Sequence, residues 1–331
     1  MVKGLVLAVL TGLVCLVAAG GWLLSYGLRP GPPAAEPTAV VLIERGSSVA
    51  EIGNQLAAAG LINDDPRFVL LTRIMGLSAQ LPAGEFQLAT GRRPVDLVRE
   101  LAAARPLQHH ITLQEGLNLV EIADRFAAGG WIDRDRFLEL AHDPQLLEEL
   151  GLSGLASLEG YPFPDTYSLV RPGPNERELL TRLVGRALAI WDQLAAGGQE
   201  IERHDVFTLA SIVEKETGQA QERPLVAGVF LNRLARGMRL QSDPTVVYGL
   251  ADFSGRLSRE DLRTPTPYNT YLISGLPPGP ICSPGEASLQ AVLKPAETDF
   301  LYFVAKNDGT HHFSRNLREH NRAVRIYQRG R

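Results

Sequence analysis

The amino-acid sequence predicts an α+β protein built from an N-terminal membrane-spanning helix, two duplicated small α+β modules and a larger mixed α+β domain. Three observations lead to this prediction. The chain begins with a long uncharged apolar run, a pattern of strand, glycine turn and helix then occurs twice, and the remainder alternates amphipathic helices with proline-rich loops. At 331 residues, 45% of them hydrophobic, the chain is long enough for more than one buried core.

The apolar run defines the first part, which we place at residues 1–29. From Gly4 to Leu28 no residue is charged, and about 20 apolar residues suffice for a helix to cross a membrane. A cleavable signal peptide is the alternative, because residues 18–21 are small, but the apolar residues continue through Tyr26. We therefore expect an uncleaved single-pass anchor in the cell (inner) membrane, with the body of the protein on the periplasmic or extracellular side.

The next segment, PGPPAAEPT at residues 30–38, is rich in proline and lacks an apolar period, which is typical of a semi-rigid extended spacer. After it we expect the repeated modules over residues 39–150 and the larger domain over residues 151–331. Several prolines between residues 162 and 174 favour an ordered connection near that boundary. A long helix is expected from residue 176 to residue 196.

The duplicated modules are visible as an internal repeat. The segment VVLIERGSSVAEIGNQLAAAGLINDDPRF from Val40 recurs as HITLQEGLNLVEIADRFAAGGWIDRDRF from His110. Each copy predicts a strand, a glycine turn, an amphipathic helix and a second helix. This order resembles LysM-type carbohydrate-binding modules, but repeated helical modules also serve as scaffold or spacer, and both interpretations stay open. The matched positions are Gly46 and Gly116, Glu51 and Glu121, Ile52 and Ile122, and Gly60 and Gly130.

The overall charge and the cysteines narrow the function. The formal net charge is -4, so the composition does not favour a nucleic-acid partner. The two cysteines, Cys15 and Cys282, lie far apart in the sequence, and Cys15 falls inside the first apolar run. A disulfide framework is therefore excluded, and redox chemistry is not implied.

The stretch DVFTLASIVEKET, Asp205 to Thr217, predicts one helix with Asp205 as its N-cap. With about 100 degrees per residue, Glu216 lies at the centre of the apolar stripe and Glu214 lies far round the helix from it. Desolvation on the core-facing side raises the pKa of a carboxyl group from about 4.3 and keeps it protonated near neutral pH. A general acid needs this property, so Glu216 is the candidate catalytic acid. The alternative is a last-turn glutamate paired with a nearby arginine.

The region after this helix is expected to form the walls of a binding site. Residues 222–238 predict an antiparallel neighbouring helix, and two loops follow, RLQSDPTVVYGL and the proline-rich TPTPYNTYLISGLPPGP. Tyr, Asn, Gln and Asp side chains on rigid loops suit the hydroxyl and acetamido groups of sugars. The candidate substrate-binding residues are Gln241, Ser242, Asp243, Thr245 and Tyr248 in the first loop, and Tyr268, Asn269 and Thr270 in the second.

The C-terminal part predicts structural elements rather than a cofactor site. Ser283, Pro284 and Glu286 are expected to begin a helix as N-cap, first helical residue and capping-box acid. The strings FLYFVA and HHFS around an NDG turn predict a β-hairpin, and RNLREHNRAVRIYQ predicts a final helix. Adjacent histidines on a strand point to opposite faces, and no HExxH, CxxC or phosphate-binding glycine loop accompanies them. We expect no metal and no cofactor.

These motifs together resemble the membrane-anchored endolytic murein transglycosylases. The resemblance covers nearly the whole chain and depends on LEGYPFPDTYSL, ASIVEKETG, VFLNRLARGMRLQSDPTVVYGL, TPYNTYLISGLPPGPICSPG and LYFVAKNDGTHHFS. In that family the catalytic acid is the second glutamate of the E-K-E-T string, which corresponds to Glu216. The sequence departs from the family at Ser242, where threonine is common, and at Ser283, where asparagine is common.

The resemblance implies cleavage of the β-1,4 bond between N-acetylmuramic acid (MurNAc) and N-acetylglucosamine (GlcNAc) inside a peptidoglycan strand. The 6-hydroxyl of the muramic residue would close a 1,6-anhydro ring in place of water, so one residue can serve first as acid and then as base. Glu214 would then have no catalytic role and would form a solvated ion pair. The resemblance also implies action at the membrane on newly made glycan, limiting strand elongation, with the peptidoglycan synthesis machinery as a candidate partner.

Two other functions remain compatible with the sequence. A muramidase-type hydrolase would use Glu216 as acid and either Asp243 or Glu214 as base. A non-catalytic, membrane-tethered scaffold would bind peptidoglycan through the repeats alone. Analysis of the products separates the two enzymes, and a Glu216→Gln variant that changes nothing would favour the scaffold.

Overall fold

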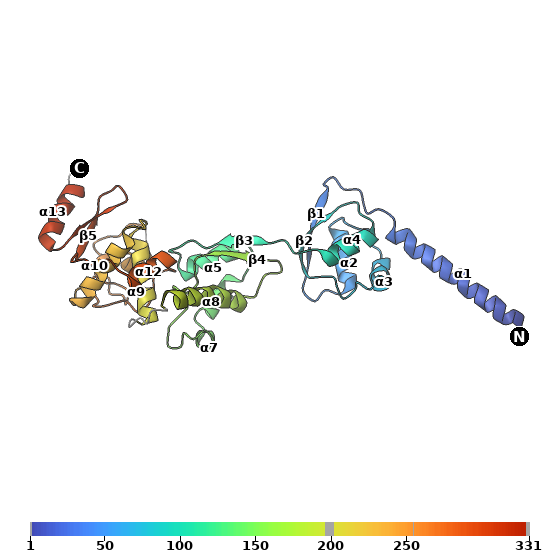
Figure 1. The fold of residues 1–331 in the computed structure, drawn as a ribbon, viewed down its shortest axis with the longest axis horizontal. Coiled ribbons are helices and arrows are strands. Elements are labelled where there is room, and N and C mark those ends of the chain that lie inside the picture. Colours follow the sequence, from blue (N-terminus) through green and yellow to red (C-terminus); the bar gives the residue numbers. More distant parts are fainter. Residues whose placement is uncertain (1, 196–201, 254, 329–331) are drawn as a thin grey trace. The chain divides into compact units, whose positions relative to one another are not determined.

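The computed structural model describes residues 2–195, 202–253 and 255–328. Within the second of two compact units, the helices α9 (Arg203–Glu216), α10 (Arg223–Ala235) and α12 (Glu286–Leu293) pack against one another, and Figure 1 shows them grouped near strand β5 (Tyr302–Ala305). The first unit comprises the chain up to Ile111 together with Ser168–Gly173, and the second comprises Thr112–Tyr167 and the chain from Pro174 onward.

This division lies earlier in the chain than the boundary predicted near residue 151. The physical reason is packing, because the second copy of the repeat is joined to the elements that follow it. Within this copy α6 (Arg134–Leu140) packs against α8 (Glu176–Leu194), and α8 in turn packs against α12 (Glu286–Leu293). The long helix was predicted for nearly the same residues as α8.

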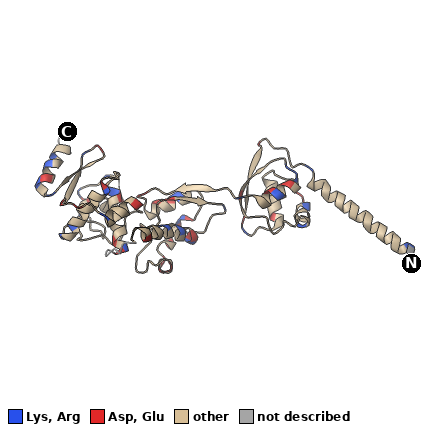
Figure 2. Ribbon diagram, in the orientation of Figure 1, with Lys and Arg blue, Asp and Glu red and all other residues tan. Residues whose placement is uncertain are grey.

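Helix α1 (Val2–Gly27) is the apolar N-terminal element (Figure 1). Lys3–Gly27 is long and apolar enough to cross a membrane, a test that a signal sequence at an N-terminus also passes. Figure 2 shows that α1 carries no charged residue after its first turn. The large apolar side chains along most of the helix are exposed, as a surrounding lipid would require.

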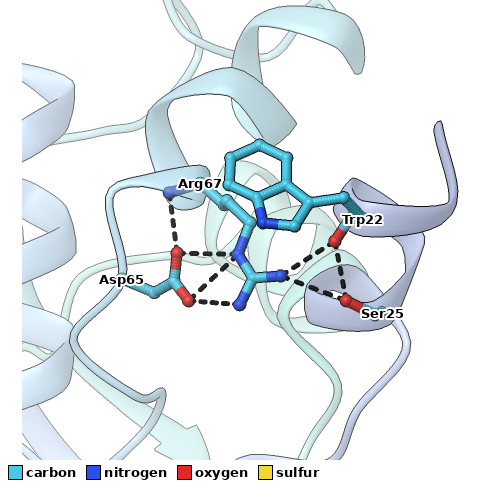
Figure 3. Close-up of polar contacts among 4 residues, drawn as sticks. All are labelled: Trp22, Ser25, Asp65 and Arg67. Carbon is cyan, nitrogen blue, oxygen red and sulfur yellow. Dashed lines mark hydrogen bonds and ion pairs between the residues drawn. The ribbon is translucent and has the colours of Figure 1, made fainter. Parts of the chain in front are cut away.

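The end of α1 is part of the first unit. Tyr26 is only 4% exposed and belongs to the core of that unit. Arg67 donates to the carbonyl of Trp22 at 2.8 Å and to Ser25 at 3.1 Å, and it forms an ion pair with Asp65 at 2.6 Å (Figure 3). The guanidinium also lies over the rings of Trp22 and Tyr26 at 5.0 and 5.1 Å.

The segment after α1 was predicted to be a semi-rigid extended spacer, but its start is attached to the first unit. The Gly31 amide donates to the carbonyl of Arg92 at 3.0 Å, and a side chain at position 31 would clash with the carbonyl of Leu61 at 2.6 Å. Glycine is therefore needed where this segment crosses the first unit. Among the prolines that follow, Pro33 and Pro37 are exposed, and none of the three lies in a helix or strand.

The first unit holds the first copy of the repeat. Strands β1 and β2 pair antiparallel, with Val41 opposite Phe86. Alternate residues of both strands face helices α2 to α4, and the core contains Leu56, Phe68 and Leu97, all almost fully buried. The elements are β1 (Thr38–Ile43), α2 (Val49–Ala58), α3 (Arg67–Ile74), β2 (Gly84–Ala89) and α4 (Pro94–Ala103).

The second copy repeats the order and local geometry of the first. Both first helices begin with a capping box, Ser48 with Glu51 and Asn118 with Glu121. Strands β3 and β4 form a two-stranded sheet, as β1 and β2 do. The elements are β3 (His109–Thr112), α5 (Leu119–Ala128), α6, α7 (Pro144–Glu149), β4 (Thr166–Leu169) and α8. The likeness to LysM modules remains a prediction.

The rest of the second unit is mainly helical and ends in the predicted hairpin and helix. Strands β5 and β6 pair antiparallel, with Ala305 opposite His311. The elements are α9 (Arg203–Glu216), α10 (Arg223–Ala235), α11 (Asp243–Gly249), the short 3-10 helix η1 (Asp261–Arg263), α12 (Glu286–Leu293), β5 (Tyr302–Ala305), β6 (His311–Ser314) and α13 (Leu317–Tyr327).

Three local predictions were wrong. The N-cap of α9 is Glu202 rather than Asp205, which lies in the first turn. The stretch RLQSDPTVVYGL is not a loop throughout, because Pro244 sits at the start of helix α11. The N-cap of α12 is Gly285, and Ser283 is used instead in backbone hydrogen bonds to the second copy of the repeat.

Candidate active site

A cavity of about 470 Å³ lies in the second unit. Its walls come from the ends of α9 and α10, the start of α11, the β5–β6 hairpin and one stripe of α13. These segments are far apart in the sequence, and tertiary packing brings them together. The polar and aromatic lining residues are Glu216, Arg233, Gln241, Asp243, Tyr271, Tyr302, Phe303, His311, His320, Asn321 and Gln328.

Glu216 is the last residue of α9, and its side chain reaches this cavity. Its carboxyl group has a pKa raised to about 7, chiefly by burial and to a smaller extent by the negative charge of Asp243. The hydrogen bond from Ser242, the charge of Arg233 and a positive charge on His311 act in the opposite direction. The Ser242 hydroxyl donates to Oε1 of Glu216 at 2.5 Å, which fixes the orientation of the carboxyl group. Near neutral pH a large part of this group is protonated.

The segment that carries Ser242 is held by buried hydrogen bonds. Gln241 has a positive φ of 52°, and its backbone N–H donates to the backbone carbonyl of Thr270. The Ser242 amide donates to Oγ1 of Thr270 at 2.9 Å, and Thr245 Oγ1 donates to the Ser242 carbonyl at 2.7 Å. These contacts hold a strained turn, formed by Gln241, Ser242 and Asp243, next to the Glu216 carboxyl group.

The structure separates the predicted substrate-binding residues into two groups. Gln241 and Asp243 line the cavity beside Glu216. Ser242, Thr245, Asn269 and Thr270 are almost fully buried, with side chains hydrogen-bonded inside the protein. These four buried side chains support the segments that form the cavity wall.

The two remaining predicted residues, Tyr248 and Tyr268, lie edge to face with ring centroids 4.7 Å apart. Tyr248 lines a second cavity of about 340 Å³, and Asp243 lines both cavities. The Tyr248 hydroxyl donates to Glu159 at 3.0 Å. Burial raises the pKa of Glu159 to about 7, and the backbone amides of Leu119 and Gly160 also donate to this carboxylate.

Glu214 faces away from the first cavity. Its Oε1 lies 2.9 Å from Arg223, and its Oε2 accepts from the Gly285 amide at 3.0 Å. The ion pair was predicted, but its solvation was not correct, because the Glu214 side chain is only 6% exposed. Helix α9 is buried on almost all sides, between α10, α11 and α12.

Sequence reasoning missed two cavity residues that organise the polar wall. Arg233 is 7% exposed, donates to the carbonyls of Leu301 and Leu240, and lies over the Tyr302 ring at 5.1 Å. A signal existed, because Arg233 shares the face of α10 that carries Val226 and Phe230. Tyr271 donates to Asp243 at 2.6 Å, and no local pattern marks that contact.

The histidines do not form a metal centre in the part of the chain that the structure describes, where no cluster of three or more His, Cys, Asp or Glu side chains occurs. His311 and His320 line the cavity, whereas His312 packs near Tyr327 with ring centroids 5.7 Å apart. His311 and His312 therefore point to different faces of β6, as the strand pattern predicted.

Comparison with known proteins agrees with this architecture. Residues 41–326 match the model of the YceG-like family. The endolytic murein transglycosylase of Bacillus subtilis strain 168 is 30% identical over 331 residues, covering 94% of this chain and 91% of that protein. The protein of the same name from Streptococcus pneumoniae serotype 2 is 30% identical over 98% of this chain, which spans 65% of its length. A 2.6 Å crystal structure of a YceG-like protein from Listeria monocytogenes superposes with a TM-score of 0.60 at 30% identity, covering 86% of this chain and 98% of that one.

Proposed function

This chain belongs to the YceG-like family, and from that premise we propose that it is an endolytic peptidoglycan lytic transglycosylase. It cleaves the β-1,4 bond between MurNAc and GlcNAc within a glycan strand and leaves a 1,6-anhydroMurNAc end. Relatives named endolytic murein transglycosylase support the reaction class. The observation that carries the proposal is Glu216, a cavity-lining carboxyl group whose pKa is raised to about 7 by burial.

In the proposed reaction Glu216 donates its proton to the glycosidic oxygen as the bond from C1 to that oxygen breaks. The 6-hydroxyl of the same muramic residue attacks C1, and in the scheme with a single catalytic residue its proton passes to the Glu216 carboxylate, so the ring closes without water. Ser242 holds the Glu216 carboxyl group in one orientation, and Arg233 supplies positive charge that stabilises the carboxylate left after proton donation. The intramolecular hydroxyl replaces an activated water, which removes the need for a second carboxylate.

Of the two bases considered for the hydrolase alternative, Asp243 lines the cavity and Glu214 does not. Glu214 cannot serve as the base at this cavity, since both its oxygens are used by Arg223 and Gly285 away from the lining. Asp243 lines the cavity but accepts the Tyr271 hydroxyl. The outcome is decided by the products, because a hydrolase leaves a reducing MurNAc end and a lytic transglycosylase leaves an anhydro end.

The decisive experiment compares Glu216→Gln with Glu214→Gln in the full-length protein, purified in detergent and mixed with isolated glycan strands. Glutamine keeps the size of glutamate but cannot deliver a proton, so Glu216→Gln is expected to lose at least about a hundredfold in turnover. Glu214→Gln is expected to be much milder. Mass spectrometry of 1,6-anhydroMurNAc ends measures both. If the Glu214→Gln protein were inactive and the Glu216→Gln protein active, the assignment of Glu216 as the acid would be wrong. If the wild type bound glycan strands without cleaving them, the scaffold function would be favoured.

We also propose that α1 is an uncleaved single-pass anchor with the body on the periplasmic or extracellular side. This location would place the enzyme beside newly made glycan, where cleavage limits strand elongation next to the peptidoglycan synthesis machinery. The length and composition of α1 support the anchor. Membrane fractionation followed by N-terminal sequencing tests it, and recovery of a soluble protein that begins near residue 20 would overturn it.

A further inference from the structure

His311 occupies a position in the cavity that the single-carboxylate scheme does not use. It lies on β6 and lines the same cavity as Glu216. The two groups lie close enough that a positive charge on His311, once its ring is protonated, would lower the pKa of Glu216. The His311 ring packs edge to face on Phe303, with centroids 5.4 Å apart, so one aromatic wall limits its movement.

One carboxylate holds both the backbone and the side chain of His311. Oε1 of Glu222 accepts the His311 amide at 2.8 Å, and Oε2 lies 2.7 Å from His311 Nδ1. Both side chains are 13% exposed. The Glu222 carboxyl group has a lowered pKa because its hydrogen bonds to the His311 amide and imidazole outweigh the effect of its burial. An ionised carboxylate at Nδ1 favours the imidazole tautomer that carries its proton on Nδ1 and leaves Nε2 as an acceptor.

Glu222 is also tied to the catalytic end of α9. Thr217, which follows Glu216 directly, donates from Oγ1 to Oε2 of Glu222 at 3.3 Å. The same Thr217 oxygen accepts the amide of Gln219 at 3.0 Å. The short connection between α9 and α10 therefore sets the position of the acid and, through Glu222, of the imidazole.

We propose that His311 is the general base of the proposed transglycosylase reaction and that Glu222 is its positioning residue. The inference rests on the proposed function. His311 Nε2 takes the proton of the muramic 6-hydroxyl while its oxygen forms the new bond to C1. Glu216 gives its proton to the leaving glycosidic oxygen as the old C1 bond breaks. Afterwards His311 is an imidazolium and Glu216 a carboxylate, and proton transfer between them or through solvent restores the starting state.

This division of roles makes a specific claim about pH. The rate should fall at low pH because His311 becomes protonated, and at high pH because Glu216 loses its proton. A single carboxylate that acts as acid and then as base requires only the loss at high pH. The other titratable or charged groups that line the cavity are Arg233, Asp243, Tyr271, Tyr302 and His320, and none of them is altered in the variants below.

The test measures kcat/KM for anhydro-end formation from pH 4 to pH 9 in the full-length protein in detergent. The wild type is expected to show a bell-shaped profile. His311→Gln is expected to lose about a hundredfold, together with the fall in rate at low pH. Glu222→Gln is expected to lose less and to move the low-pH limb to lower pH, because a neutral partner stabilises the imidazolium less. His312→Gln is the matched control on the other face of β6 and should keep the wild-type rate and profile.

The outcomes separate this inference from the proposed function. If the wild type makes no anhydro ends, the proposed function fails. If the wild type makes them with no loss of rate at low pH, the role of His311 is overturned without any variant. A His311→Gln protein that loses activity but keeps the low-pH limb also overturns it, since the histidine would then only hold the hairpin in place.

Discussion

The turns at Gly46 and Gly116 have the same backbone and different surroundings. Their φ angles are 80° and 81°, and each precedes a helix that begins with a capping box. Nothing lies within 4 Å of the position a Cβ would take at Gly46. At Gly116 the amide donates to the Ser283 carbonyl at 2.9 Å, and the carbonyl accepts Lys215 Nζ at 3.2 Å. Lys215 precedes Glu216, the proposed catalytic acid, so the second turn helps to hold α9.

The two units also differ in the pKa values of their carboxyl groups. In the first unit the carboxyl groups of Glu51, Asp65 and Asp96 have lowered pKa values because of hydrogen bonds at or near the surface. The second unit also contains surface carboxyl groups with lowered pKa values, such as Asp261 and Glu319, but there burial raises the pKa values of Glu159 and Glu216. The same glycine turn and capped helix occur in both units. Only in the second unit are they packed next to buried carboxyl groups, and only there do they belong to the candidate site.

The largest effect is expected from the matched core residues Ile52 and Ile122. Each is almost fully buried, so Ile52→Ala and Ile122→Ala should each destabilise their own unit by about 2–5 kcal/mol. Only Ile122→Ala is expected to reduce cleavage of glycan strands, because only the second copy supports α9. Amide hydrogen exchange, assigned to each unit, measures the stabilities. Equal loss of cleavage in both variants would mean that the two copies support the site alike.

The pH dependence of stability gives the next largest contrast. Between about pH 4.5 and pH 7 the unfolded chain loses the proton of residue 159 while the folded chain keeps it, so this group makes the second unit less stable as pH rises. Its contribution is at most roughly 3.5 kcal/mol, from about 1.4 kcal/mol per pKa unit over the rise from 4.5 to about 7. Glu159→Gln should therefore cost more stability at pH 5 than at pH 7.5, as measured by urea unfolding.

The first unit supplies a control of opposite sign. The lowered pKa of Glu51 means that its contribution to stability is present above its unfolded pKa and is lost as pH falls through the folded pKa. Glu51→Gln should therefore cost more at pH 7.5 than at pH 4. An effect of Glu159→Gln that does not change with pH would show that this carboxyl group is ionised in the folded protein.

The smallest expected effect, and the sharpest comparison, comes from Gly46→Ala and Gly116→Ala. Both turns have a positive φ, so each alanine should cost about 1–2 kcal/mol of backbone strain. At Gly116 the added Cβ would lie 3.6 Å from Lys215, an ordinary contact, so no further steric cost is expected. Unfolding should report a loss of stability in both variants, and Gly116→Ala should lose more and should also lower cleavage, because strain at that turn disturbs the contacts to Ser283 and Lys215. Equal activity in both variants would remove the supporting role of the second turn.

Much of the architecture follows from local sequence signals. The apolar run, the repeated glycines and capping boxes, and the hairpin around the NDG turn are each decided by residues close together in the chain. Glu216 was selected in the same way, by its angle on one helix. The pattern could not show that α9 is buried on nearly all sides, which is why Glu214 was expected in solvent and is instead buried against Arg223.

The sequence by itself therefore determined the kinds of elements, the repeat and the identity of the proposed acid, because these depend on periodicity and short-range hydrogen bonds. Only the tertiary structure decided the surroundings of that acid. Arg233, Tyr271 and His311 come from three separate segments, and the Glu222 contact with His311 joins residues far apart in the chain. Burial and charge at the cavity depend on such long-range contacts, which no local pattern encodes, and they set the pKa of Glu216.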